Sequence, residues 1–144
     1  MLVEKEVVEQ LIPQKYPMAM VDGLIEQTET STTSRLILNP SNIFCKDGFF
    51  VEAGLIENMA QTAALRSGYE ASLKKEKPLV GFIGSLKRIK IHKLPQDTDT
   101  IETTITILNS LMNVLIIKGE VFCKGSLMAE GEMNIFLQNK VVKS

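Results

Sequence analysis

The sequence predicts an α+β fold in which one long central helix is wrapped by a curved antiparallel sheet. Residues 49–68, FFVEAGLIENMAQTAALRSG, are apolar or small around nearly their whole helical circumference, which is typical of a buried helix. Two strand-like segments precede this stretch, and four longer ones follow it. A helix of about six turns in that place packs most economically across the concave face of a single sheet.

The segments before this helix are short. Residues 3–12 carry apolar side chains at helical spacing, and Pro13 then stops the helix. Residues 18–29 and 31–38 are expected to form two strands joined by a polar turn. After Pro40 the chain is expected to be irregular as far as about Gly48.

The segments after the helix predict an antiparallel meander. The first strand, Leu79–Ile91, begins as an apolar run and then alternates strictly, with Leu86, Arg88 and Lys90 on one face and Lys87, Ile89 and Ile91 on the other. The next two strands, 100–108 and 113–123, are expected to meet at a turn at Asn109-Ser110, and the last, 127–137, follows Lys124-Gly125.

Length and composition set the limits on function. With 144 residues the chain is expected to form a single domain over 1–144, large enough for a core without disulfides or metals. The net charge of -1 gives no electrostatic reason to expect nucleic acid or an acidic membrane as partner. Cys45 and Cys123 are too few for a disulfide framework, so free thiols in a reducing compartment are expected. Without a signal peptide or a long apolar run, the expected location is the cytoplasm.

One stripe of the predicted helix differs from both a core face and a solvated face. It contains small or hydrogen-bonding residues: Gly54, Glu57, Gln61, Ala64 and Gly68. A glycine inside a helix costs about 1 kcal/mol relative to alanine, so something is expected to approach the backbone closely. Periodicity leaves two roles open for Glu57: a surface acid that compensates the helix dipole, or a buried functional carboxylate.

The segments LIPQKYPMAMVDGLIE, GLIENMAQTAA and GFIGSLKRIKIHKLPQDT, in that order, resemble the 3-hydroxyacyl-(acyl-carrier-protein) dehydratase family. The resemblance covers most of the chain, and its most specific part is E-x-M-A-Q at 57–61 preceded by the segment 11–22. It implies the hotdog fold, in which two protomers join sheets edge to edge and active sites lie between their central helices. Glu57 matches the family's helix carboxylate.

The catalytic histidine of that family is missing. The family's loop before the helix carries a histidine that removes the substrate's α-proton, whereas this chain reads NIFCKDGFFVEAGLIE there. Gln14 stands where the family usually has histidine, and the only histidine, His92, falls in the strand KIHKLP. The spacing in DGFFVEAGLIENMAQTAA is closer to a divergent branch, the dehydratase-like subunits of aryl polyene gene clusters, which lack the loop histidine and resemble partners of a second, His-bearing dehydratase.

This resemblance assigns expected roles. An apolar tunnel would favour the protonated form of Glu57, which would act as the acid that protonates the leaving hydroxyl. The backbone N–H groups around Ala53 and Gly54, at the helix start, would bind the thioester carbonyl, and Gly54 would let the substrate come close. Gln61 would orient Glu57 or bond the hydroxyl directly; the alternative is a cap on a buried carbonyl.

A basic run, Lys87, Arg88, Lys90 and Lys93, has two readings of equal weight. In the first, the run contacts either the phosphate of a phosphopantetheine arm or the acidic surface of a carrier protein. In the second, it is simply a solvated strand face.

Candidates for the missing base are poor. Glu52 and Asp47 are expected to be first-turn or loop acids favoured by the helix dipole. Cys45 is disfavoured as a nucleophile because no histidine lies near it in the sequence.

Three functions therefore follow from the sequence. The first is a 3-hydroxyacyl thioester dehydratase acting on acyl carrier protein or acyl-CoA, with no cofactor or metal of its own. The second is a catalytically silent subunit or scaffold of a dehydratase heterodimer, and the third is a hotdog acyl thioesterase. A homodimer or higher homo-oligomer is expected, or a heterodimer with a His-bearing dehydratase.

Overall fold

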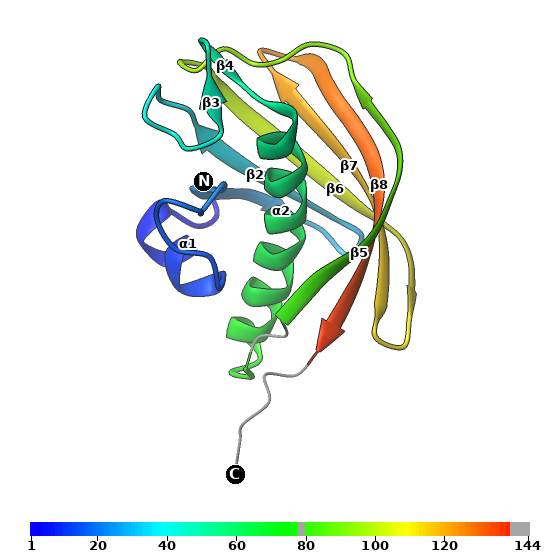
Figure 1. The fold of residues 1–144 in the computed structure, drawn as a ribbon. Coiled ribbons are helices and arrows are strands. Elements are labelled where there is room, and N and C mark those ends of the chain that lie inside the picture. Colours follow the sequence, from blue (N-terminus) through cyan, green and yellow to red (C-terminus); the bar gives the residue numbers. More distant parts are fainter. Residues whose placement is uncertain (78–79, 139–144) are drawn as a thin grey trace.

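A long helix lies in the hollow of a curved sheet, as predicted (Figure 1). The structure is a computed structural model and describes residues 1–77 and 80–138. The helix is α2 (Glu52–Leu73). The sheet has the order β1-β2-β6-β7-β8-β5 with antiparallel neighbours, and its strands are β1 (Gly23–Gln27), β2 (Ser31–Ile37), β5 (Val80–Ile91), β6 (Thr100–Leu111), β7 (Val114–Cys123) and β8 (Ser126–Gln138).

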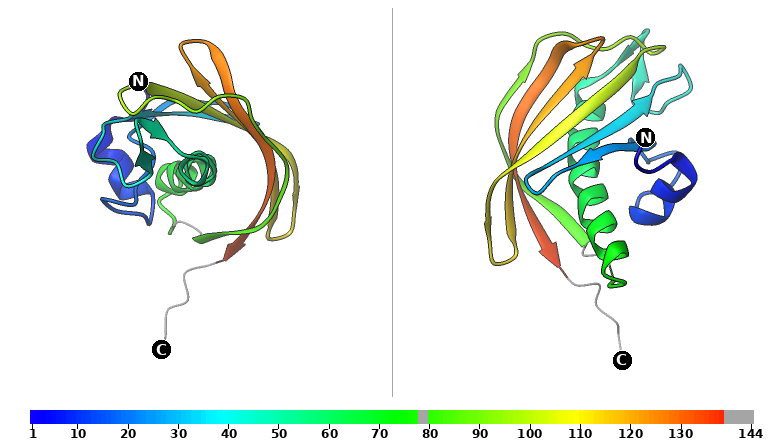
Figure 2. Two further views of the ribbon diagram at one scale, coloured as in Figure 1. Left: turned by 45° about the horizontal axis from the view of Figure 1, so that its top comes forward. Right: turned by 180° about the vertical axis from the view of Figure 1, so that it is seen from behind.

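The core lies between α2 and the concave face of the sheet. Leu55, Met59 and Ala63 of α2 pack in one cluster with inward-facing side chains of β6, β7 and β8. Gly119 of β7 leaves room for this contact, because a Cβ there would lie 2.5 Å from the sulfur of Met59. Viewed along its axis, α2 has the sheet on one side and the short helix α1 (Lys5–Leu11) on the other (Figure 2).

The predicted helix starts too early and ends too early. Residues 49–50 are not helical: they form β4 (Phe49–Phe50), which pairs with β3 (Cys45–Lys46) in a small hairpin. Asp47 and Gly48 make its turn with φ of 53° and 87°, values that favour glycine and tolerate aspartate. At its other end α2 continues past Gly68 to Leu73.

Gly68 does not end α2, because the glycine serves a helix contact. A Cβ at position 68 would collide with the carbonyl oxygen of Leu11, the last residue of α1. The prediction that something approaches the backbone closely is confirmed here, and the approaching group belongs to the chain itself. Glycine at 68 therefore allows α1 to pack on α2.

Two details of the predicted meander are wrong. The hairpin between β6 and β7 turns at Met112 and Asn113, whereas Asn109 is paired with Ile116 inside the ladder. In β5 the register shifts between Lys87 and Lys90, which breaks the predicted strict alternation.

The bulge in β5 changes which residues share a face. Arg88 lies within it with φ of 53°. Lys87 and Lys90 oppose Glu132 and Glu130 of β8 and thus share a face. The predicted strand begins at Leu79, which lies outside the described residues. The last residues of the predicted domain, 139–144, also lie outside them.

Candidate functional site

Glu57 lies in the second turn of α2, where it is half-buried at the edge of an apolar pocket. The pocket has a volume of about 230 Å³ and lies between α2 and the strands β5, β7 and β8. Its other lining residues are Gln14, Ala60, Ala63, Ala64, Ser67, Gly81, Phe82, Ile83, Leu115, Ile135 and Leu137. The carboxyl group is thus placed beside a space that suits an apolar chain.

Gln61 connects Glu57 to the rest of the protein. This fully buried amide donates from Nε2 to Glu57 Oε1 at 3.0 Å and to the Met18 carbonyl at 2.9 Å. Its Oε1 accepts a hydrogen bond from the Met20 N–H at 2.5 Å. Gln61 therefore orients Glu57 and also caps a backbone carbonyl, so the two predicted alternatives coexist. Both amide protons are used, which leaves none for a substrate hydroxyl.

Asn58 is a second buried amide, and the sequence analysis did not single it out. Its Nδ2 donates to the Met20 carbonyl at 2.7 Å, and its Oδ1 accepts a hydrogen bond from the hydroxyl of Thr103 on β6. The spacing of three residues between Asn58 and Gln61 in ENMAQ is the signal that would have found it. Together the two amides hold the segment 18–20 against α2.

Of the two backbone donors predicted to bind the thioester, those of Ala53 and Gly54, only one is unused among the described residues. Gly54 N–H is bonded to the Val51 carbonyl at 2.9 Å. A Cβ at 54 would lie 2.6–2.7 Å from atoms of Phe50 and Phe44, so internal packing already requires a glycine here. Ala53 is exposed, and its N–H takes part in no hydrogen bond within the ranges that the structure describes.

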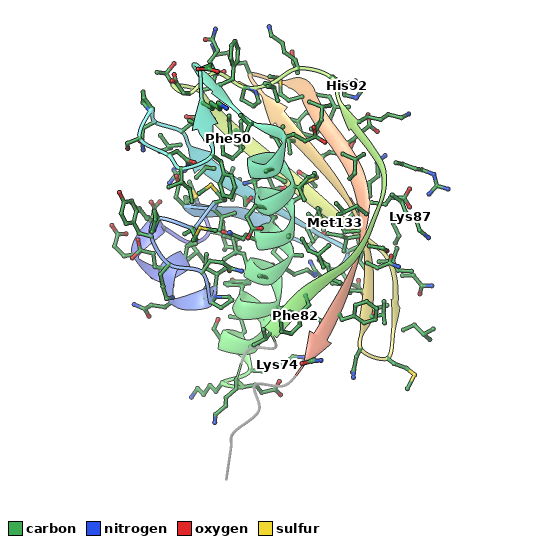
Figure 3. The ribbon with its side chains drawn as sticks, in the orientation of Figure 1. Phe50, Lys74, Phe82, Lys87, His92 and Met133 are labelled. Atoms are coloured by element: carbon green, nitrogen blue, oxygen red, sulfur yellow. The ribbon has the colours of Figure 1, made fainter. Side chains whose placement is uncertain are left out.

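Lys87 of the predicted basic run points away from α2, on the outer side of β5 (Figure 3). Lys90 shares its face, and Lys93 follows the end of β5. Lys87, Arg88, Lys90 and Lys93 are all exposed. Arg88 forms an ion pair of 2.7 Å with Glu132 of β8. The run is partly neutralised by this neighbouring strand and does not line the Glu57 pocket.

His92 is not placed to act as a base beside Glu57 of the same chain. Its Nε2 lies 2.8 Å from Glu130 Oε2, and this hydrogen bond lowers the pKa of the Glu130 carboxyl. Ile83, which lines the pocket, lies nine residues earlier, about 30 Å along an extended strand.

The other candidate bases are also unsuitable. Glu52 and Asp47 are exposed, as expected for a first-turn acid and a loop acid. Burial, and secondly the carboxylate of Asp97, raise the pKa of the Cys45 thiol, which disfavours the nucleophilic thiolate. In the described ranges no group of three or more His, Cys, Asp or Glu side chains is arranged to hold a metal ion.

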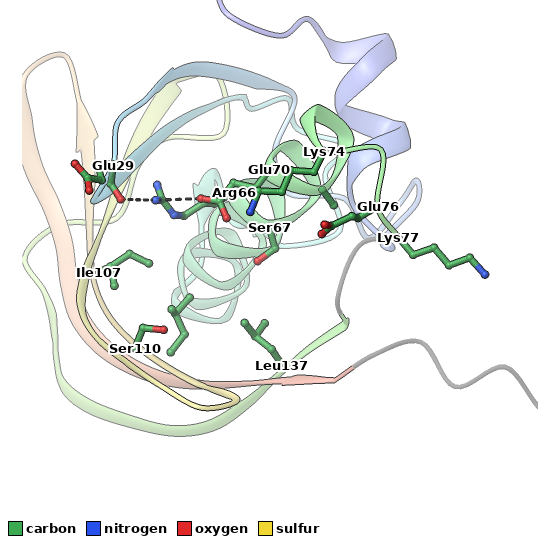
Figure 4. A pocket seen from close by; sticks show the side chains of 12 residues that line it. Glu29, Arg66, Ser67, Glu70, Lys74, Glu76, Lys77, Ile107, Ser110 and Leu137 are labelled. Atoms are coloured by element: carbon green, nitrogen blue, oxygen red, sulfur yellow. Dashed lines mark hydrogen bonds and ion pairs between the residues drawn. The ribbon is translucent and has the colours of Figure 1, made fainter.

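A larger pocket of about 640 Å³ adjoins the first one at the C-terminal end of α2 (Figure 4). The two share Ser67, Leu115 and Leu137. Several of its lining residues are charged. Buried Arg66 lies in its wall, where it bonds the carbonyl of Glu29 at 2.7 Å and the carboxylate of Glu70 at 3.2 Å.

The helices in the described part of the chain are too short or too polar to cross a membrane.

Comparisons with known proteins support the predicted family. The chain is 26% identical over 134 residues to the 3-hydroxyacyl-[acyl-carrier-protein] dehydratase FabZ of Methylobacterium sp. (strain 4-46), covering 89% of this chain and 81% of that protein. The fold is similar to a chain of the dehydratase heterocomplex ApeI:P from Xenorhabdus doucetiae, with a TM-score of 0.84, 19% identity, and coverage of 92% and 91%.

A more distant structural relative is a hypothetical thioesterase protein with coenzyme A from Streptococcus pneumoniae TIGR4 (TM-score 0.64, 11% identity, coverage of 81% and 85%). These neighbours confirm the hotdog fold. The sequence profile of the ApeP-like family, described as ApeP dehydratase, matches residues 6–143. The chain therefore belongs to the ApeP-like dehydratase family.

Proposed function

We propose that this chain acts on 3-hydroxyacyl groups carried by acyl carrier protein or CoA, as the acid-bearing subunit of a dehydratase. The observation that carries the proposal is Glu57, half-buried beside an apolar pocket and oriented by Gln61. The pocket continues along α2 to Ser67, ten residues further, a length of about 15 Å. An acyl chain would lie along this path, with its thioester near the helix start.

The reaction needs a base, an acid and a donor for the thioester oxygen. The base takes the C2 proton, and the electron pair of that C–H bond forms the C2–C3 double bond as the C3–O bond breaks. Glu57 gives its proton to the departing hydroxyl, which leaves as water, and the proton held by the base later restores the acid. Ala53 N–H, at the start of α2, would face the thioester oxygen. No cofactor is needed beyond the phosphopantetheine that carries the substrate.

The base is proposed to be a histidine of a second hotdog chain. In support, the only histidine of this chain is engaged with Glu130, and a relative in the fold comparison is named as a dehydratase heterocomplex. β5 ends the six-stranded sheet and exposes Phe82, Ile83 and Leu86. This edge would pair with the partner's sheet and bring the partner's histidine toward Glu57.

The test uses the chain together with a His-bearing dehydratase subunit and a 3-hydroxyacyl carrier protein. Formation of the enoyl product is expected, and Glu57→Gln should lower its rate by about 10²–10⁴-fold, the usual contribution of a general acid. Glu52→Gln, an exposed carboxylate of the same helix, is the matched control and should retain the rate.

Other outcomes point to the other two functions. Full enoyl formation by Glu57→Gln would identify the chain as a silent subunit. Release of free thiol from acyl-CoA without enoyl product would identify a thioesterase.

A further inference from the structure

The pocket beside Glu57 contains a second polar side chain that the proposed reaction does not yet use. Gln14 follows α1 and lines the pocket together with Glu57. Its Oε1 is buried and has no hydrogen-bond partner among the residues that the structure describes. Ser85 Oγ is the other such atom there, and Ser85 does not line this pocket. A buried acceptor left unpaired is destabilising, so Gln14 Oε1 is an atom whose hydrogen-bonding capacity a ligand can satisfy.

The backbone on both sides of Gln14 is held in place. Before it, α1 packs against α2 at Gly68. After it, the Lys15 carbonyl accepts hydrogen bonds from the N–H groups of Met18 at 2.7 Å and Ala19 at 3.2 Å. The segment then continues to Met20, which is bound by Gln61. Gln14 is thus presented to the pocket by a fixed stretch of chain rather than by a free loop.

The unpaired atom is an acceptor, so its partner must be a donor. The hydroxyl group at C3 of a 3-hydroxyacyl chain has one O–H donor and lone pairs on oxygen. When a lone pair accepts the proton of Glu57, the O–H hydrogen needs a separate acceptor. Gln61 is not that acceptor, because its Oε1 already accepts a hydrogen bond from the Met20 N–H. Its two amide protons are also occupied.

We propose that Gln14 accepts a hydrogen bond from the 3-hydroxyl group and thereby selects 3-hydroxyacyl chains over saturated and 2-enoyl chains. A saturated chain has no donor at C3 and would leave Oε1 unpaired. The enoyl product has none either, so this contact is lost when water leaves, which favours product release. The inference rests on the proposed function, because it places the acyl chain in the same pocket.

The test is a binding measurement with ligands that cannot react. Two pantetheine amides of equal chain length, one 3-hydroxyacyl and one saturated, are titrated calorimetrically into the chain, with its partner subunit where the two form a complex. A neutral hydrogen bond predicts that the 3-hydroxy ligand binds roughly 3- to 10-fold more tightly. Gln14→Met keeps the side-chain length and removes the amide, and should bring this ratio to about one by weakening the 3-hydroxy ligand alone.

Two further variants complete the design. Gln10→Met makes the same substitution at an exposed position of α1, outside the pocket, and should keep the wild-type ratio. Gln14→Asn shortens the side chain by one methylene and should also bring the ratio of the two affinities to about one. It provides a second test if Gln14→Met does not fold.

Equal binding of both ligands by the wild-type chain, or an unchanged ratio in Gln14→Met, would overturn the role of Gln14 while leaving Glu57-dependent dehydration intact. Failure to bind either ligand would overturn the proposed function together with this inference.

Discussion

Replacing Gln61 by methionine tests whether this amide holds the segment before β1 against α2. Methionine matches glutamine in length, so the change removes hydrogen bonds rather than volume. It leaves the Met20 N–H without its partner in a buried setting and the Met18 carbonyl without its partner in a half-buried one. An unpaired buried group costs about 1–3 kcal/mol, and one that water reaches costs less. The expected loss of unfolding free energy is therefore about 2–4 kcal/mol.

The assays are thermal unfolding and amide hydrogen exchange. For a domain of this size about 3–4 °C is lost per kcal/mol, so the midpoint should fall by roughly 10 °C. Met20 N–H should exchange faster than amides of the β6–β7 ladder. Gln96→Met, an exposed glutamine, is the control. A midpoint within the error of wild type, with Met20 still protected, would show that the hydrogen bonds of Gln61 do not hold this segment.

Two further changes probe how α2 is fixed at its C-terminal half. Arg66→Met removes a buried guanidinium that bonds three backbone carbonyls at the β1–β2 turn. Urea unfolding should show that the free energy of unfolding falls by about 3–5 kcal/mol. The exposed substitution Glu70→Gln should change it little. Gly68→Ala places a methyl group against the Leu11 carbonyl, so α1 must shift; the expected cost is about 1–3 kcal/mol. A gain in stability, as for an alanine in an open helix site, would show that the contact with α1 is not tight.

Periodicity predicted the layers of the fold because both layers bury one continuous face. The apolar and small residues of the predicted helix include Leu55, Met59 and Ala63, which enter the core in the structure. The predicted helix ends were wrong where tertiary contacts, rather than hydrophobic periodicity, determine the backbone conformation. Gly68 resembles a helix end, yet the contact with Leu11 requires it inside the helix. Residues 49–50 resemble the helix start, yet they pair with β3 in a hairpin, and Phe50 is buried in the core cluster.

The site was predictable only in part. Glu57 and Gln61 stand out because polar residues four apart in a small-residue stripe are neither core nor solvated surface. The position of Gln14 was not predictable, since it depends on how α1 and the segment up to Met20 fold back along α2. Strand periodicity also failed for the basic run, because the bulge at Arg88 is a backbone irregularity with no pattern in hydrophobicity.

The hydrogen bond between Gln61 and Glu57 bears directly on which oxygen would carry the acid proton. A protonated carboxyl group has one oxygen that only accepts and one that carries the proton. Because Gln61 Nε2 donates to Glu57 Oε1, the proton of the acid form belongs on Oε2. Within the described ranges Glu57 forms no ion pair with a lysine or arginine. An amide donor can bond a carboxylate or the accepting oxygen of a carboxylic acid, which suits the proposed role of Glu57 as an acid. With Oε2 as donor and Gln14 Oε1 as acceptor, a 3-hydroxyl group between them would have both its lone pair and its hydrogen paired, which a saturated chain cannot achieve.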